Sequence, residues 1–247
     1  MIPKIIHYCW FGGKPLTPLA KKSIKSWKRT CPDYTIVRWD ETNFDINGCK
    51  YTTEAYHEKK WAFVSDYARL KIIYENGGIY LDTDVELINN LDRVLNDEYF
   101  LAIEKGTNLY KDSKMVSIAT GLGFGACAGN ETIYMLLKEY GNDGFIVNGT
   151  IDTTPCPIRN TNAMKKFGFT GEDIIYKVNG GTVYPSEYFC PKDSVSLEVN
   201  LTPNTLSIHH FDGSWMPAKE RIKMKIRQLL GKKTADKIRK LFCWIRR

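Results

Sequence analysis

The chain has 247 residues, of which 43% are hydrophobic and 26% are charged, which is typical of a globular protein large enough for one α/β domain with a sizeable core. Its seven cysteines are odd in number and include no Cys-x-x-Cys pair, which argues against a disulfide framework or a thiolate zinc site and favours a reducing cytosol. No apolar stretch reaches the roughly 18 residues of a membrane span, and the run Ile5-Ile6 is too short for a cleavable signal.

Predicted strands and helices alternate along the first part of the chain. Residues 2–7 and 35–39 are expected to be strands, and residues 18–29 a helix with its lysines outward. Further along, the pattern predicts mainly helix over 52–76, a strand over 99–103, helices over 130–140 and 160–167, and short strands at 182–184 and 205–209. Residues 141–157 are the best candidate for a substrate-shaping loop. This alternation predicts an α/β fold with a mostly parallel central sheet and a ligand at the carboxyl ends of its strands.

The most informative run is Gly77-Gly78-Ile79-Tyr80-Leu81-Asp82-Thr83-Asp84-Val85. A glycine pair ends a helical pattern, a short apolar strand follows, and two aspartates stand at i and i+2. In an extended backbone these carboxylates would leave the same face about 7 Å apart. They would repel each other unless a cation lay between them, and oxygen ligands suit Mg²⁺ or Mn²⁺. The run therefore predicts a metal–diphosphate site at a strand end.

The preceding segment, residues 61–76, is apolar almost all round and is predicted to be a buried helix. Asp66 and Arg69 lie within it at i and i+3, on one face. Two interpretations stay open, because buried charges need partners. The two side chains form an internal ion pair, or they face the pocket of Asp82 and Asp84.

The positive charge of the chain is concentrated at its end. Residues 219–247 hold twelve Lys and Arg against two acidic residues, a formal charge of +10, which leaves residues 1–218 at −3 of the total +7. Apolar residues recur there at helical spacing on either side of Gly231. A cationic amphipathic segment of this kind favours contact with an anionic membrane surface. Packing of its apolar stripe on the body or a partner is the main alternative, and nucleic acid is not expected because no stacking platform or recognition motif accompanies the charge.

Several motifs in order resemble one family of enzymes. Ser65-Asp66-x-x-Arg69 followed by the Gly-Gly…Asp-x-Asp run resembles the signature of family 32 glycosyltransferases, the DXD-motif sugar transferases that include bacterial capsule and lipopolysaccharide enzymes. The opening segment 2–12, the segment 27–39 and the closing segment 209–215 are similar to further elements of that family. The resemblance is close over residues 1–110 and 205–216 and loose between them. It implies a GT-A type nucleotide-sugar-binding domain over residues 1–218, followed by the basic tail 219–247.

The resemblance also implies a divalent ion, Mn²⁺ or Mg²⁺, at the Asp-x-Asp motif. Asp84 is expected as the first metal ligand, with Asp82 touching the ribose or sugar and the metal. His210 is the candidate third ligand because His210-Phe211-Asp212-Gly213 resembles the metal-binding His-x-x-Gly pattern of related retaining transferases, and the choice between His209 and His210 stays open. Ser214 and Trp215 are the alternative contacts on that side, to the metal and to the donor phosphate.

For the nucleotide-sugar donor, the resemblance implies that Asp66 and Arg69 hold sugar hydroxyls and phosphate, which a planar guanidinium fork suits. Tyr8 and Trp10 stand where the family places the base and ribose, and aromatic faces stack on such rings. A core role for Trp10 is the alternative. Glu104 and Asn148 are guesses for the acceptor side.

The expected activity is therefore retaining, metal-dependent transfer of a hexose or N-acetylhexosamine from a nucleotide-diphosphate sugar, with UDP favoured, to a glycan acceptor. The membrane-seeking tail suggests a lipid-linked oligosaccharide acceptor, as in surface polysaccharide synthesis, and a peripheral position at the inner face of the membrane. Two rival classes are a non-catalytic membrane adaptor with a relict transferase fold and a haloacid-dehalogenase-like phosphatase. The phosphatase family should also show a downstream Gly-Asp-x-x-x-Asp motif, and this sequence has none.

Overall fold

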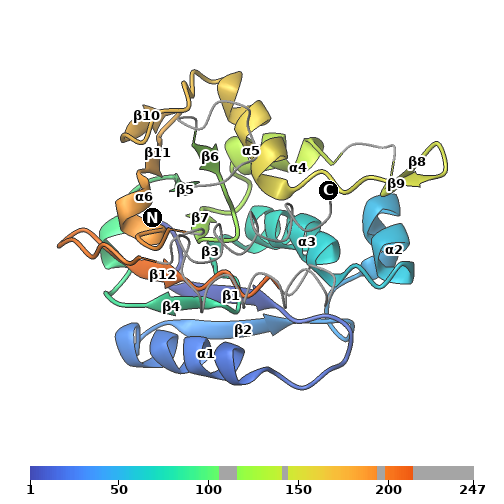
Figure 1. Ribbon diagram of the computed structural model, residues 1–247, viewed down its shortest axis with the longest axis horizontal. Coiled ribbons are helices and arrows are strands. Elements are labelled where there is room, and N and C mark those ends of the chain that lie inside the picture. The colour runs from blue at the N-terminus through green and yellow to red at the C-terminus, as the bar shows by residue number, and fades with distance from the viewer. Residues whose placement is uncertain (106–115, 141–143, 194–197, 214–247) are drawn as a thin grey trace, which may run out of the picture.

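The computed structural model describes residues 1–105, 116–140, 144–193 and 198–213. At its centre lies a mixed sheet with the strand order β10-β11-β5-β7-β3-β1-β2, to which β6 is added beside β5 (Figure 1). These strands are β1 (Ile5–Cys9), β2 (Thr35–Trp39), β3 (Gly78–Tyr80), β5 (Tyr99–Glu104), β6 (Ser117–Ile118), β7 (Phe124–Ala126), β10 (Tyr176–Val178) and β11 (Gly181–Tyr184). Two small antiparallel pairs accompany it: β4 (Val85–Leu87) with β12 (Ser207–His209), and β8 (Ile146–Val147) with β9 (Thr150–Ile151).

Most strands of the described sheet run in one direction. β2, β1 and β3 are mutually parallel, β5 and β11 are parallel to each other, and β7 runs against both β3 and β5. Five of the seven strands along the path therefore share one direction, and only β7 and β10 oppose it. The prediction of a mostly parallel central sheet flanked by helices is confirmed.

Helices cover both faces of this sheet. They are α1 (Pro18–Thr30), α2 (Lys50–His57), α3 (Trp61–Asn76), α4 (Glu131–Lys138), α5 (Cys156–Lys165) and the short α6 (Ser186–Phe189), with 3₁₀ turns at η1 (Ile46–Gly48) and η2 (Asp92–Val94). A hydrophobic core lies on each face of the sheet, and successive side chains of strand β5 point alternately into one and the other. Tyr99, Leu101 and Ile103 pack with α2 to α5, whereas Phe100 and Ala102 pack on the α1 and α6 side. Every one of these five side chains is fully buried.

The described elements differ most from the predictions at three boundaries. The expected helix 52–76 is two helices, because the chain turns between them at Lys59 with a φ of 56°. The first strand begins at Ile5, since Ile2 bonds instead to Leu95 O. Helix α5 begins earlier than expected, at Cys156, because Pro155 occupies its N-cap with the extended backbone that a helix start requires.

None of the described helices is long and apolar enough to cross a membrane. The six cysteines within the described part of the chain are free thiols, as expected from their number and spacing. The basic tail 219–247, and with it the predicted domain division at 218, lies outside the described residues.

Candidate active site

The candidate site lies where strand β3 ends and the chain turns toward β4. Gly77 terminates α3 with a φ of 67° and Gly78 follows with a φ of 95°, a pair of conformations that glycine adopts without steric cost. A side chain at Gly78 would also lie 2.9 Å from His7 Nε2. The glycine pair therefore lets the buried helix α3 feed directly into the central strand, which brings Asp66 and Arg69 close to the Asp-x-Asp motif.

The two aspartates stand in a tight turn and not in an extended strand. Val85 N–H donates to Asp82 O at 3.0 Å, which closes a four-residue turn over the motif. The expectation of strand-like alternation for this pair is therefore wrong. The carboxylates converge instead through the turn and through contacts from distant elements.

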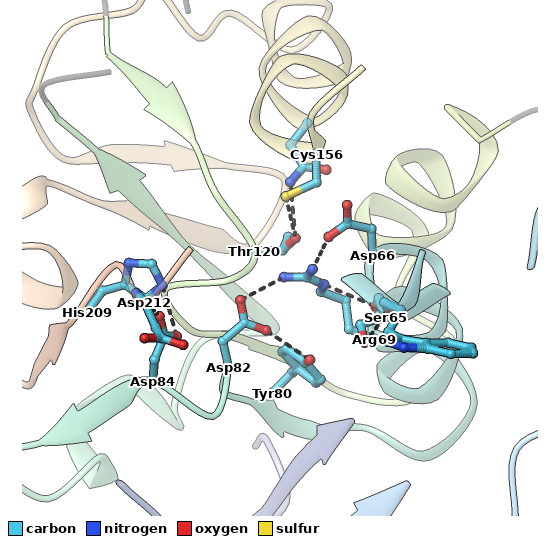
Figure 2. Close-up of polar contacts among 12 residues, drawn as sticks. Ser65, Asp66, Arg69, Tyr80, Asp82, Asp84, Thr120, Cys156, His209 and Asp212 are labelled. Carbon is cyan, nitrogen blue, oxygen red and sulfur yellow. Dashed lines mark hydrogen bonds and ion pairs between the residues drawn. The ribbon is translucent and has the colours of Figure 1, made fainter. Parts of the chain in front are cut away.

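Asp84 is held by the segment around β12. Asp84 Oδ1 lies 3.1 Å from His209 Nε2, and the Asp212 backbone N–H donates to Asp84 Oδ2 at 2.9 Å (Figure 2). Antiparallel pairing of β12 with β4 sets this geometry, with His209 opposite Val85. Burial alone would lower the pKa of His209, but the Asp84 carboxylate outweighs it and raises this pKa to about 9. Burial would raise the pKa of Asp84, whereas His209 and the backbone donors hold it at about 2. The imidazolium and the carboxylate are therefore a charged pair at neutral pH.

Asp82, Asp84 and His209 together fit a divalent ion. One ligand atom from each lies within 4.8 Å of the others, and two carboxylates with an imidazole are a donor set that Mn²⁺ accepts. In the described structure, His209 lies against Asp84 and Arg69 lies against Asp82, so each carboxylate has a basic group beside it. A divalent ion bound between the carboxylates would add positive charge at the same place.

The structure separates the two histidines, between which the sequence left the metal ligand open with His210 as the first candidate. His210 Nε2 contacts Glu86 Oε2 at 2.8 Å and does not belong to the Asp82–Asp84 group. Neighbouring side chains of an extended segment point to opposite faces, so only one member of the pair can face the aspartates. The structure places His209 there.

Arg69 joins helix α3 to the Asp-x-Asp turn. Its guanidinium contacts Asp66 on one side and lies 3.5 Å from Asp82 Oδ2 on the other (Figure 2). Its Nε donates to Ser65 O at 3.2 Å, and its charged end lies 5.2 Å from the centre of the Tyr80 ring. The internal ion pair that the sequence allowed is therefore present, and its arginine also contacts Asp82. Burial raises the pKa of Asp66 to about 6, against the opposing effect of Arg69.

Two residues that the sequence analysis did not single out fix the orientation of Asp82. Tyr80 O–H donates to Asp82 Oδ1 at 2.9 Å, and Asp82 N–H donates to Gly121 O at 3.3 Å. A Cβ on Gly121 would overlap Asp82 Oδ2 and lie 3.1 Å from Arg69 Nη1. Tyr80 stands two residues before Asp82 and could have been suspected from the motif. Gly121 could be found only through the fold.

The first turn of α5 closes the site above Asp66. Cys156 Sγ accepts a contact from Thr120 Oγ1 at 3.9 Å (Figure 2). Asn160 Nδ2 donates to the same hydroxyl at 3.1 Å. All three side chains are buried. This cluster places the loop before α5 beside the Asp66–Arg69 pair, and no motif in the sequence pointed to it.

The other site residues proposed from the sequence differ in their burial and contacts. Tyr8 is buried and packs against Trp27, with ring centres 5.7 Å apart, so its role at the nucleobase stays a prediction. Trp10 is partly exposed and donates from Nε1 to Lys14 O at 2.6 Å, so its ring stays a candidate for the base. Asn148 has a φ of 50° at the tip of the β8–β9 hairpin, where a turn explains it. Ser214 and Trp215 lie outside the described residues.

Glu104 ends strand β5, and its carboxyl group interacts electrostatically with His209, Asp84 and Asp82. Burial raises the pKa of its carboxyl group to about 7, with His209 lowering it and Asp84 and Asp82 raising it further. A carboxyl group with this pKa is present in both protonation states near neutral pH.

Comparison with known proteins identifies the class. Residues 18–101 match a family model described as a glycosyltransferase sugar-binding region containing a DXD motif. Asp82-Thr83-Asp84 lies within the matched segment. Residues 18–101 are therefore a sugar-binding region of the DXD glycosyltransferase type, which confirms the enzyme class predicted from the Ser-Asp-x-x-Arg and Gly-Gly…Asp-x-Asp motifs.

Solved structures of glycosyltransferases are also similar at low identity. The PaToxG glycosyltransferase is 18% identical, with 67% of this chain and 69% of that chain covered and a TM-score of 0.46. A glycosyltransferase involved in the glycosylation of the major capsid of PBCV-1 is 14% identical, with 91% and 100% covered and a TM-score of 0.43. The galactosyltransferase LgtC, solved with donor and acceptor sugar analogues, is 12% identical, with 89% and 94% covered and a TM-score of 0.44. No curated protein sequence matches the chain.

Proposed function

We propose that this glycosyltransferase moves a hexose or N-acetylhexosamine from a nucleotide-diphosphate sugar to a glycan acceptor, with retention of configuration and with a divalent metal ion. The observation that carries the proposal is the convergence of Asp82, Asp84 and His209, whose ligand atoms lie within 4.8 Å of one another. Three such groups from two segments far apart in the sequence make a site for a cation and not a solvated pair of carboxylates.

Asp82, Asp84 and His209 would hold Mn²⁺ or Mg²⁺. A bound ion of this kind acts as a Lewis acid that neutralises charge on a departing diphosphate. Because Asp84 is already positioned by two donors, we assign it the main ligand role. His209 would bind through a ring nitrogen after losing its proton.

Arg69 and Asp66 would recognise the donor. The Arg69 guanidinium is buried and fixed by four protein groups, so it presents its charge toward the site without further loss of conformational entropy. Asp66 would accept hydrogen bonds from sugar hydroxyls, and Trp10 would stack on the base. A UDP-sugar is favoured over a GDP-sugar through the family resemblance.

For retention, we favour substitution at the front face, in which the leaving phosphate assists removal of the acceptor proton. No residue is assigned as a nucleophile. Glu104 supplies a carboxyl group whose pKa of about 7 suits proton exchange with an acceptor hydroxyl near neutral pH.

We further propose that the acceptor is a lipid-linked oligosaccharide of surface polysaccharide synthesis and that the enzyme works as a peripheral protein at the inner face of the membrane. The support is the +10 charge and amphipathic spacing of residues 219–247, because each basic residue near an anionic bilayer contributes about 1 kcal/mol.

The direct test is a titration of UDP- and GDP-sugars into the full chain with and without Mn²⁺, followed by thermal shift and slow hydrolysis of the donor. We expect one nucleotide sugar to stabilise the protein only with metal present, and Asp84→Asn to abolish that response. Glu75→Gln, an exposed change on the outer side of α3, is the matched carboxylate control and should behave as the unaltered chain. Absence of any metal-dependent donor response would refute the proposed activity.

A further inference from the structure

The outward face of helix α1 carries only positive charge. The helix Pro18–Thr30 contains five basic residues and no acidic one. All five are exposed: Lys21, Lys22, Lys25, Lys28 and Arg29. The opposite face is buried through Ala20, Ser23, Ser26 and Trp27. Because residues 1–218 have a net charge of −3, this helix is a local exception on a slightly acidic body.

The orientation of α1 is fixed by hydrogen bonds on its buried face. Trp27 Nε1 donates to Val85 O at 2.8 Å, and Leu87 N–H donates to Ser26 Oγ at 3.0 Å. These bonds attach the helix to β4, and α1 forms the outermost layer on that side of the molecule (Figure 1). Its basic face is therefore held rigidly away from the body.

Most of these charges have no acidic partner. Lys22 pairs with Glu86 at 2.9 Å. For Lys21, Lys25, Lys28 and Arg29, the described part of the chain provides no ion pair. A row of uncompensated cations on one rigid helix is suited to a broad anionic surface, which needs no specific geometry.

The end of the described chain lies next to the same helix. Glu86, which binds Lys22, also contacts His210 Nε2 at 2.8 Å. Strand β12 pairs with β4, and β4 contacts α1. The described chain ends at Gly213, three residues after His210, and in the sequence it is followed by residues 219–247, which carry +10.

We propose that the outward face of α1 is a membrane contact in addition to the one proposed for the basic tail, and that it lies against an anionic bilayer. The occupant is a lipid surface, because the helix combines clustered charge with no exposed aromatic side chain on which nucleic-acid bases could stack. This proposal rests on the proposed membrane-linked function for its purpose, but its test measures lipid binding and not transfer.

The test compares two charge-matched variants of the full chain. One carries Lys21→Gln, Lys25→Gln and Lys28→Gln. The control carries the same number of changes at exposed lysines near α2, Lys50→Gln, Lys59→Gln and Lys60→Gln. Binding is measured by co-sedimentation with vesicles of phosphatidylglycerol and phosphatidylcholine, and with pure phosphatidylcholine vesicles as the neutral reference.

We expect the α1 variant to bind the anionic vesicles about tenfold or more weakly than the unaltered chain, and the control to change much less. Equal loss in both variants would mean that only net charge matters, and no loss in the α1 variant would mean that the tail alone binds; either result overturns the proposal. Both outcomes are independent of transferase activity.

A second measurement locates the contact in the unaltered protein. Amine-reactive labelling followed by mass spectrometry should show protection of Lys21, Lys25 and Lys28 by anionic vesicles, and none by neutral vesicles. Lys59 and Lys60 should label equally in both. Unchanged labelling of the α1 lysines, or their protection by an RNA oligonucleotide and not by vesicles, would overturn the lipid assignment.

Discussion

Arg69 Nη1 lies 3.5 Å from Asp82 Oδ2, so a buried helix and the Asp-x-Asp turn meet through an ion pair. The same guanidinium contacts Asp66 within its own helix. The Arg69 guanidinium thus balances two carboxylates: Asp66, which is proposed to bind the sugar donor, and Asp82, which is proposed to bind the metal. Four predictions follow from this arrangement and its surroundings.

Removal of the Arg69 charge should destabilise the fold. Arg69→Met leaves Asp66 and Asp82 without their shared cation, and the Arg69 side chain is only 4% exposed. Breaking a buried pair in this way costs about 3–5 kcal/mol. The measurement is the free energy of unfolding in urea. Lys71→Met, on the exposed side of the same helix where Lys71 pairs with Glu75, should cost less than about 1 kcal/mol. Adding Asp66→Asn to Arg69→Met should recover part of the loss, and a strictly additive result would contradict the coupling.

The two neighbouring histidines should differ in metal binding. His209→Ala removes a ligand of the proposed ion and should weaken Mn²⁺ binding by at least about tenfold. His210→Ala removes only the contact with Glu86 and should leave Mn²⁺ binding nearly unchanged. Manganese titrations followed by thermal shift measure both. The reverse ranking would restore His210 as the ligand.

A methyl group at Gly121 should damage the site more than the fold. The Cβ of Gly121→Ala would overlap Asp82 Oδ2, so the carboxylate must move. A displacement of about 1 Å in a catalytic group can cost about a hundredfold in rate, and the readout is kcat/KM for donor hydrolysis together with Tm. Gly129→Ala is the control, since nothing lies within 4 Å of its Cβ, although its φ of 74° adds some backbone strain. Normal turnover in Gly121→Ala would show that Asp82 does not need its described position.

His7 should make the fold sensitive to acid. Trp39 Nε1 donates to its Nδ1 at 2.9 Å, and its Nε2 lies 3.1 Å from Gly77 O, which assigns the neutral ring with its proton on Nε2. Burial lowers the pKa of His7 to about 4 from an ordinary 6.5. The neutral ring makes its full contribution to the free energy of unfolding above pH 6.5. This contribution, at most about 3 kcal/mol, is lost as the pH falls from 6.5 toward 4.

The acid effect is measured by urea unfolding at pH 7.5 and pH 5.0 for the unaltered chain and for His7→Gln. The variant, which has no ring to protonate, should lose less stability between the two pH values. An identical acid loss in both proteins would assign the effect to other groups.

The amino-acid sequence alone determined the α/β class, the longer helices, half of the described strands, and the presence of a DXD motif with an associated Asp–Arg pair. These features are local, because hydrophobic periodicity fixes which faces are buried and the glycine pair fixes where helix α3 ends. Boundaries at Lys59 and Pro155 were misplaced, since single backbone conformations decide them.

Only the tertiary structure decided which distant groups meet. The pairing of β12 with β4 placed His209 and not His210 against Asp84, and a one-residue change of register would have exchanged them. Gly121 and Cys156 reached the site through loops that no spacing rule relates to Asp82. Tyr8 was assigned to the base from its position in the opening strand, but the packing of α1 buried it against Trp27. Contacts within a turn or a strand follow from neighbouring residues, whereas a binding site depends on how whole elements pack, and this information is spread over the entire chain.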